Sequence, residues 1–188
     1  MQQLLIITPV KDSIDHTVRT MEAVVQSELD VPHRYVVFND NSTPENTARL
    51  HTEAARLGVE VVDLATLTDH PSPNYLFVLR RCRKEALADD AGLLIVESDV
   101  TVQRDTLQKL FDGATARPNC GIAAAVTVDE EGKINYPYLY ARGKEGQDYD
   151  CKKHCSFCCS LLTPALLKAC DFDRLDDSKN WFDVTISH

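Results

Sequence analysis

The sequence predicts one α/β domain, in which helices flank a mostly parallel, mixed β-sheet. Strand and helix patterns alternate through the first half of the 188 residues, as they do in βαβ units whose strands pair in parallel. Residues 93–96 form a wholly apolar run, which is typical of a strand buried on both faces. The run leads into Glu97 and Asp99, whose ionised carboxylates are unstable in a dry interior. We therefore expect the strand to end there, at the edge where open α/β sheets bind ligands.

Turn residues and apolar spacing set the bounds of the expected elements. Pro44 stands at a favoured first-turn position, and Gly58 ends the same helix. Two prolines predict a loop at residues 66–75, and the polar, glycine-containing stretch 136–150 is expected to be a mobile loop. Strands are expected at residues 4–8, 34–38, 59–64, 93–96, 122–128 and 157–162, helices at 18–27, 44–57, 76–89, 106–116 and 164–170, and a hairpin turn at 129–133.

The composition is that of a globular protein, with 44% hydrophobic and 26% charged residues. A formal net charge of -9 argues against a nucleic-acid or anionic-membrane partner, because both repel a strongly negative surface. The apolar stretch at residues 4–7 is followed by Pro9 and is too short for a signal peptide or a membrane span. We expect a cytoplasmic protein, free or at the membrane face, with no integral membrane segment and with mostly reduced cysteines.

A late group of cysteines leaves two interpretations open. Five of the seven cysteines fall after residue 150, with His154 among them, so structural zinc is one possibility. Against zinc, Cys158 and Cys159 are adjacent, and no second pair follows at the spacing of a zinc ribbon. Residues 157–162 also fit a strand in which cysteines act as small hydrophobic residues. The strand interpretation is the preferred one.

Three polar segments follow three of the predicted strands, at residues 8–12, 39–43 and 97–99. Because the carboxyl ends of parallel strands meet at one edge of a sheet, these segments are expected to converge. Glu97 and Asp99 could hold Mg²⁺ or Mn²⁺, hard cations that prefer oxygen ligands and often share them with phosphate groups. The alternative is that both acids only cap the helix that starts near Gln103.

Five short segments stand in a definite order: Pro9-Val10-Lys11-Asp12, Asn39-Asp40-Asn41-Ser42, a basic segment that places Arg81 a fixed interval before Asp99, Asp171-Phe172-Asp173-Arg174, and Phe182-Asp183-Val184-Thr185-Ile186. The order and spacing of these segments resemble the family 2 glycosyltransferases, inverting enzymes with the GT-A fold. This chain departs from the family pattern where Glu97 and Asn39 replace aspartates, where Lys84 replaces a glycine, and where Phe182 replaces the glutamate that precedes the catalytic base.

The resemblance implies a role for each matched residue. Asp40 would bind the base or ribose of a UDP- or GDP-sugar, and Arg81 would approach the base or the diphosphate. Asp99 would ligate Mn²⁺ or Mg²⁺, supported by Glu97 directly or through water, and Asp183 would deprotonate an acceptor hydroxyl on a glycan or glycolipid. The residues assigned to the nucleotide are Pro9, Val10, Asp12, Asp40, Arg81 and Ser98.

Each role also has a structural alternative. Asp40 could close an Asx-turn, Arg81 could face water, and Asp183 could cap a final helix. The resemblance divides the domain into a nucleotide-binding half, residues 1–101, and an acceptor-side half, 102–188, which ends soon after Asp183 whereas family members continue. A non-catalytic domain of the same fold that binds a nucleotide or a protein is the main alternative function. A nucleotidyltransferase is a weaker one, because no glycine-rich phosphate loop follows the first strand.

Overall fold

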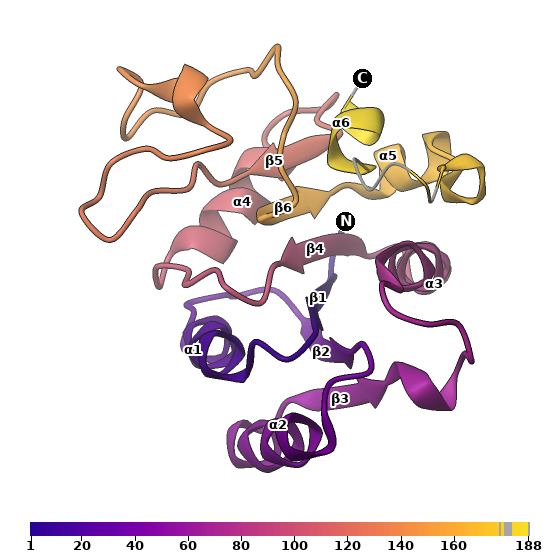
Figure 1. Ribbon diagram of the computed structural model, residues 1–188. Coiled ribbons are helices and arrows are strands. Elements are labelled where there is room, and N and C mark those ends of the chain that lie inside the picture. Colours follow the sequence, from indigo (N-terminus) through magenta and orange to yellow (C-terminus); the bar gives the residue numbers. More distant parts are fainter. Residues whose placement is uncertain (177, 179–181, 188) are drawn as a thin grey trace.

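The computed structural model describes residues 1–176, 178 and 182–187 and confirms the predicted α/β fold (Figure 1). In this part of the chain a six-stranded sheet has the order β3-β2-β1-β4-β6-β5. The pairs β1–β2, β1–β4 and β2–β3 are parallel, whereas β6 runs antiparallel to both β4 and β5. The strands are β1 (Leu4–Val10), β2 (His33–Asn39), β3 (Glu60–Asp63), β4 (Gly92–Val96), β5 (Ile122–Ala124) and β6 (Cys159–Leu162).

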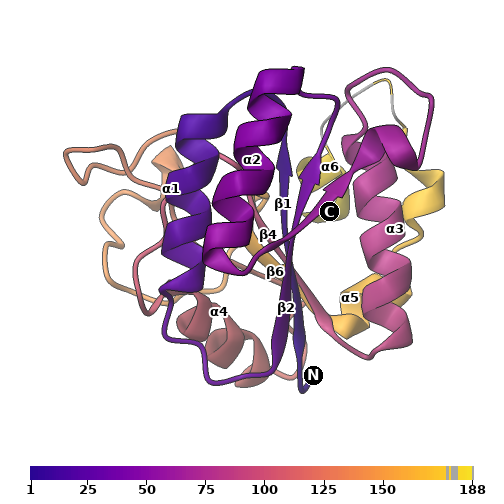
Figure 2. The ribbon, with the colours of Figure 1, turned by 90° about the horizontal axis from the view of Figure 1, so that it is seen from below.

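Helices cover both faces of the sheet (Figure 2). One face packs against α1, α2 and α4, and the other against α3, α5 and α6. Alternate residues of β4 therefore enter different cores: Leu93 and Ile95 pack with α3, whereas Leu94 and Val96 pack with α4. The α-helices are α1 (Ile14–Val25), α2 (Pro44–Leu57), α3 (Tyr75–Ala88), α4 (Thr106–Thr115), α5 (Pro164–Ala169) and α6 (Phe182–Ser187), and short 3-10 turns lie at Leu64–Thr66, Leu139–Ala141 and Phe172–Arg174.

The clearest local signals gave the most accurate bounds. The bounds predicted for α2 are confirmed: the Thr43 side chain accepts the Asn46 N–H at its start, and Gly58 ends it at φ 70°. β4 is buried throughout, as its apolar run predicted. The hairpin turn is also confirmed, since Val128 bridges Ile134 and the Asp129 N–H donates to the Lys133 carbonyl.

The elements that differ most from their predicted bounds are α1 and β5, and each difference has a physical reason. α1 begins at Ile14, one turn earlier than predicted, because Ile14 packs into the core beneath α2. β5 ends at Ala124 rather than at residue 128, since Val126 and Val128 leave the sheet for the hairpin and are exposed. None of the helices in the described ranges has the length and apolarity that crossing a bilayer requires.

Candidate functional site

The three polar segments predicted to converge do lie at the carboxyl edge of the sheet. Ile7 of β1 pairs with Ile95 of β4, and Val10 pairs with Asn39 of β2. The segments that follow β1, β2 and β4 therefore leave the sheet next to one another. Pro9 and Val10 form the last two residues of β1, with Val10 buried and its carbonyl accepting the Asp40 N–H at 2.8 Å.

The segment after β4 is a tight turn that holds two carboxylates. The Val100 N–H donates to the Glu97 carbonyl at 3.1 Å, and the Glu97 N–H donates to the Cys158 carbonyl at 2.9 Å. From the other face, the Thr20 hydroxyl of α1 donates to the Ser98 carbonyl at 3.1 Å. The turn is thus fixed by contacts from two elements, and it leaves Glu97 half-buried and Asp99 exposed.

Negative charge is concentrated around Glu97. Burial raises the pKa of Glu97, and the nearby carboxylates of Asp99 and Asp183 raise it further, while a hydrogen bond with the Cys158 side chain opposes the rise. Asp183 is thereby placed in the same electrostatic neighbourhood as the two acids after β4. A divalent cation would relieve the repulsion among these groups, and their oxygens are the ligands that Mg²⁺ and Mn²⁺ prefer. The donor set therefore fits a hard cation.

Protein side chains alone do not make a complete metal cage here. Within the described ranges no group of three or more His, Cys, Asp or Glu side chains is arranged to hold a metal ion. Glu97 and Asp99 would need further ligands from water or from a diphosphate, the usual situation for Mg²⁺ in nucleotide sites. The same finding gives no support to the zinc alternative for the late cysteines, and Cys159 is a buried residue of β6, as the strand interpretation predicted.

Asp183 lies in the first turn of α6. Its Oδ1 accepts the N–H of Val184 at 2.8 Å, and its carbonyl accepts the Ser187 hydroxyl at 2.6 Å. The preceding Phe182 is buried, and its ring packs against Tyr75 with centroids 6.0 Å apart. This geometry resembles the predicted capping role in that the carboxylate serves a helix N–H, but the side chain stays half-buried beside Glu97.

Asp40 is buried and fully used in hydrogen bonds within the protein. Its Oδ2 accepts the Ser72 hydroxyl and the Asn74 N–H, both at 2.7 Å, and its Oδ1 accepts the Asn74 side-chain amide at 2.8 Å. The carboxylate therefore orders residues 72–74, the segment that leads into α3. An Asx-turn, the structural alternative, would use only residues next to Asp40. The partners observed here, Ser72 and Asn74, come from a distant part of the chain.

Asp12 has a similar connecting role at the surface. It adopts φ 57°, and its Oδ1 accepts the Thr43 N–H at 2.7 Å and the Asn46 side-chain amide at 3.1 Å. These hydrogen bonds lower the pKa of Asp12. The side chain thus joins the end of β1 to the start of α2, and it keeps the two loops at the sheet edge in register.

The structure does not bring Arg81 to this edge. Arg81 is exposed on α3 and lies within electrostatic range of Glu60, the first residue of β3, whereas the carboxyl end of that strand is Asp63. Lys11 is the cation found at the edge instead: it is exposed after β1, and its Nζ donates to the Asn41 carbonyl at 3.1 Å. Arg81 lies almost two turns beyond the start of α3 at Tyr75, and the motif spacing that selected it takes no account of that distance.

Two more neighbours of the acids had no sequence signal that pointed to them. Cys158 precedes β6, and its side chain contacts Glu97 and, at 3.0 Å, the Ser156 hydroxyl. Tyr75 begins α3, and its hydroxyl lies within electrostatic range of Glu97 and Asp183. Both residues come from segments that the chain brings back to β4 only in the folded sheet.

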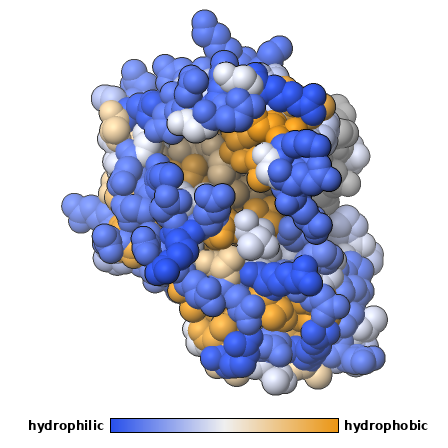
Figure 3. Space-filling model, turned by 90° about the vertical axis from the view of Figure 1, so that its left-hand side faces the viewer, coloured by the Kyte–Doolittle hydropathy of each residue, from blue (hydrophilic) through white to orange (hydrophobic). Residues whose placement is uncertain are grey.

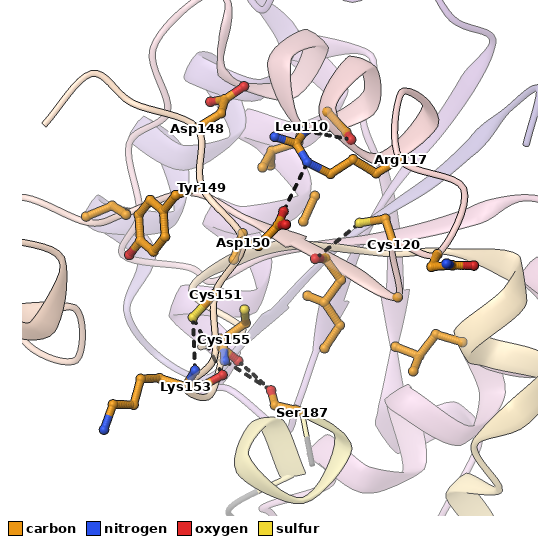
Figure 4. A pocket seen from close by; sticks show the side chains of 18 of the residues that line it. Leu110, Arg117, Cys120, Asp148, Tyr149, Asp150, Cys151, Lys153, Cys155 and Ser187 are labelled. Atoms are coloured by element: carbon orange, nitrogen blue, oxygen red, sulfur yellow. Dashed lines mark hydrogen bonds and ion pairs between the residues drawn. The ribbon is translucent and has the colours of Figure 1, made fainter. Parts of the chain in front are cut away.

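A pocket of about 680 Å³ lies beside this site rather than in it. Its walls come from the end of α4, from β5, from the segment 138–155 and from the end of α6 (Figure 4). Three tyrosines, Tyr138, Tyr140 and Tyr149, line it, and Arg117 pairs with Asp150 across it at 3.4 Å. The face that carries α4 and this segment is hollowed, with hydrophobic residues at the floor and hydrophilic ones around it (Figure 3). None of the sequence-predicted site residues lines the pocket.

Solved glycosyltransferases share the architecture of this chain. The mannosyltransferase PcManGT from Pyrobaculum calidifontis, in complex with GDP-Man and Mn²⁺, matches with a TM-score of 0.62 and 16% identity over 88% of this chain and 46% of its own. TarS from S. aureus matches with a TM-score of 0.62 and 13% identity over 98% of this chain and 33% of its own. The chain has the GT-A fold. A third GT-A structure, glucosyl-3-phosphoglycerate synthase from Mycobacterium tuberculosis with UDP, gives a TM-score of 0.55 and 14% identity over 88% of this chain and 58% of its own.

These similarities define the fold and its extent. The chain spans between 33% and 58% of the length of these three structures. No family model matches the sequence, and no curated protein is significantly similar to it. The GT-A fold predicted from the order of short motifs is therefore confirmed by structure, while the roles of individual residues stay predictions.

Proposed function

We propose that this chain is a glycosyltransferase domain that moves a sugar from a nucleotide-diphospho-sugar to an acceptor hydroxyl with inversion. The observation that carries the proposal is the convergence of Glu97, Asp99 and Asp183 at the carboxyl edge of a GT-A sheet. Ligands bind at this edge in open α/β sheets. Polysaccharide or glycoconjugate assembly is the process that such a transfer would serve, and a cytoplasmic location remains a prediction from the sequence.

The donor side would be formed by the loops after β1, β2 and β4. The backbone of Pro9 and Val10 would lie along the nucleotide, and Lys11 would contact the diphosphate in place of Arg81. Asp40 and Asp12 would order this surface, and Ser98 would complete the turn that carries the acids. Glu97 and Asp99 would hold Mn²⁺ or Mg²⁺, which supplies electrostatic stabilisation for the charge that develops on the leaving diphosphate.

Asp183 would act as the general base. In the proposed step its carboxylate takes the proton of the acceptor hydroxyl, and the acceptor oxygen bonds to the anomeric carbon. The bond from that carbon to the diphosphate oxygen breaks, and the electron pair leaves with the nucleoside diphosphate. A single in-line displacement of this kind inverts the anomeric centre. Burial raises the pKa of Glu97, and the carboxylates of Asp99 and Asp183 raise it further, so the proposed base lies within electrostatic range of the proposed metal ligands.

The tyrosine-lined pocket is the proposed acceptor side. Ser187 lines it, and the hydroxyl of Ser187 donates to the Asp183 carbonyl, so the pocket wall and the proposed base belong to the same turn of α6. Aromatic rings beside hydrogen-bonding groups suit a sugar, which has apolar faces and hydroxyl edges. The volume of about 680 Å³ accommodates a small saccharide.

A specific observation also favours a second candidate, a nucleotide-binding domain without turnover. Phe182 replaces the family's glutamate and is buried against Tyr75, so the position before Asp183 serves the core. Under this alternative the domain binds the nucleotide without turnover, and Asp183→Asn leaves nucleotide affinity unchanged.

Calorimetric titration with UDP and with GDP, each with and without Mn²⁺, tests the donor site. GDP-Man and UDP occur in the complexes of similar folds, so both bases need to be compared. We expect metal-dependent binding of one nucleotide that is lost in Asp99→Ala. The control Asp89→Ala, which changes an exposed acid at the C-terminal end of α3, should keep this binding. Binding of neither nucleotide, or equal binding by Asp99→Ala, would overturn the proposal.

A further inference from the structure

The Tyr75 hydroxyl is buried without a hydrogen-bond partner. In the described ranges it is the one side-chain nitrogen or oxygen atom in this condition. Burying a hydroxyl without a partner is unfavourable, because the group loses its hydrogen bonds to water and gains none. Such groups are rare in native proteins and call for a physical explanation.

The surroundings of this hydroxyl are rich in acceptors. Burial raises the pKa of Tyr75 well above its ordinary value, and Glu97, Asp183 and Cys158, which lie within electrostatic range, raise it further. The phenol O–H is a hydrogen-bond donor, and these groups are the acceptors around it. None of these acceptors is within hydrogen-bond distance in the ligand-free arrangement, since the hydroxyl has no partner.

The ring of Tyr75 is held in place from the acceptor side. Phe182 packs against it at 6.0 Å between centroids, with the ring planes at 49°. Phe182 occupies the position where family 2 enzymes commonly carry a glutamate. The departure from the family pattern thus has a structural counterpart: a buried aromatic ring packs against Tyr75, whose hydroxyl lies within electrostatic range of Glu97.

We propose that Tyr75 is a positioning residue that donates a hydrogen bond to Glu97 when Glu97 takes up a divalent cation. The inference rests on the proposed metal and donor site. A carboxylate has two oxygens, so Glu97 can give one to the cation and the other to Tyr75, while Cys158 contacts it in the ligand-free state. Hydrogen-bonding partners of this kind orient metal-binding carboxylates and commonly change metal affinity.

The test compares Tyr75→Phe with Tyr35→Phe, which removes a buried hydroxyl that does have a partner, Thr8 at 2.9 Å. Thermal unfolding is measured first, without metal or nucleotide. We expect Tyr75→Phe to unfold at the wild-type temperature or above it, because the deleted hydroxyl makes no hydrogen bond. Tyr35→Phe should unfold at a lower temperature. A lower Tm for Tyr75→Phe would overturn the inference, since it would reveal a bond in the ligand-free protein.

Calorimetric titration of Mn²⁺ in the presence of UDP or GDP is the second measurement. We expect Tyr75→Phe to bind Mn²⁺ about tenfold more weakly than the wild type, and Tyr35→Phe to bind it equally well. Equal affinity in Tyr75→Phe, with normal binding by the wild type, would overturn the role of Tyr75 and leave the donor site standing. Failure of the wild type to bind would overturn both.

A double-mutant cycle identifies the partner. In a Glu97→Ala background, Tyr75→Phe should cause no further loss of Mn²⁺ affinity, because the carboxylate through which Tyr75 acts is gone. Two independent, additive losses would contradict the assignment to Glu97. The cycle measures affinity rather than turnover, so it does not depend on knowing the acceptor.

Discussion

The carboxylate of Asp40 accepts the Asn74 backbone N–H at 2.7 Å and thereby ties the end of β2 to the residue before α3. The two residues are 34 positions apart in the chain, yet both are buried. The contact decides where α3 begins, and α3 begins with Tyr75. The position of Tyr75, the proposed hydrogen-bond donor to Glu97, thus depends on a hydrogen bond made by the residue before it.

Asp40→Asn should destabilise the protein. The substituted amide places two N–H donors where the Ser72 hydroxyl and the Asn74 groups now donate, so at least one buried donor loses its acceptor. We expect the free energy of unfolding in urea to fall by about 1–3 kcal/mol. Asp69→Asn, an exposed acid of the same loop, is the matched control and should change it little. Equal stability of the two variants would show that the Asp40 network does not hold the loop.

Lys11→Ala and Arg81→Ala should differ in nucleotide binding. Lys11 is exposed at the carboxyl edge, whereas Arg81 lies near Glu60 at the far end of β3. Losing an exposed cation near a diphosphate should weaken UDP or GDP binding roughly fivefold, which corresponds to about 1 kcal/mol. Arg81→Ala should bind like the wild type in the same calorimetric titration. The reverse order of effects would restore the role that motif spacing assigned to Arg81.

Glu97 should make stability depend on pH. Its pKa in the folded protein is raised above the ordinary value of 4.5, so the folded state keeps a proton that the unfolded state has lost. The free energy of unfolding therefore decreases as the pH rises from about 4.5 through the raised pKa, and the decrease then levels off.

Glu97→Gln removes this decrease, so its stability relative to the wild type should grow over the same pH range. Urea unfolding at several pH values between about 4 and 8 measures the difference. The control Glu130→Gln changes an exposed acid of the hairpin turn, and its free energy of unfolding should vary with pH as that of the wild type does. A pH-independent gap for Glu97→Gln would contradict the raised pKa.

Asp183→Asn should separate binding from turnover. An amide cannot take the acceptor proton, so transfer should slow by about 10² to 10⁴-fold while metal-dependent nucleotide binding persists. Rates of nucleoside diphosphate release, with and without candidate acceptors, provide the measurement. Unchanged rates in this variant would favour the non-catalytic alternative.

Tyr149→Ala should impair the acceptor side alone. Tyr149 lines the pocket, and the ring also lies 3.9 Å beneath Lys144 Nζ. Without the ring, the KM for a saccharide acceptor should rise roughly fivefold, which corresponds to about 1 kcal/mol, and nucleotide affinity should stay unchanged. Tyr136→Ala removes a ring that is 71% exposed and lines no part of the pocket, so it serves as the control. An equal effect of both substitutions would argue against a saccharide in this pocket.

Short-range sequence signals were enough to predict most of the fold. Pro44 and Gly58 gave the bounds of α2, and the apolar run before Glu97 gave both the burial of β4 and the position of the acids. The start of α3 was predicted to within one residue, at 76 rather than at Tyr75, but the hydrogen bonds from residues 72–74 to Asp40 that precede it were not predicted. No pattern near Tyr75 could reveal those contacts.

The same distinction explains the candidate site. Asp99 and Glu97 follow a strand directly, so their place at the edge could be predicted from the chain itself. Lys11 belongs to the polar segment 8–12, but nothing in that segment's motif indicates that its charge lies at the edge. Cys158 approaches Glu97 because β6 pairs with β4, and Tyr75 does so because α3 packs on the sheet. Short motifs do not encode either of these long-range contacts.

The position of β6 beside β4 also limits the order in which the chain can fold. β6 lies between β4 and β5, and Leu93 pairs with Leu162 across the boundary between residues 1–101 and 102–188. A fragment ending at residue 101 would expose one whole side of β4, a strand made of glycine, leucine, isoleucine and valine. Bare apolar edges of this kind recruit other strands and aggregate. The two halves are predicted to have different tasks, but during synthesis β4 stays unprotected on one edge until the second half has formed β6.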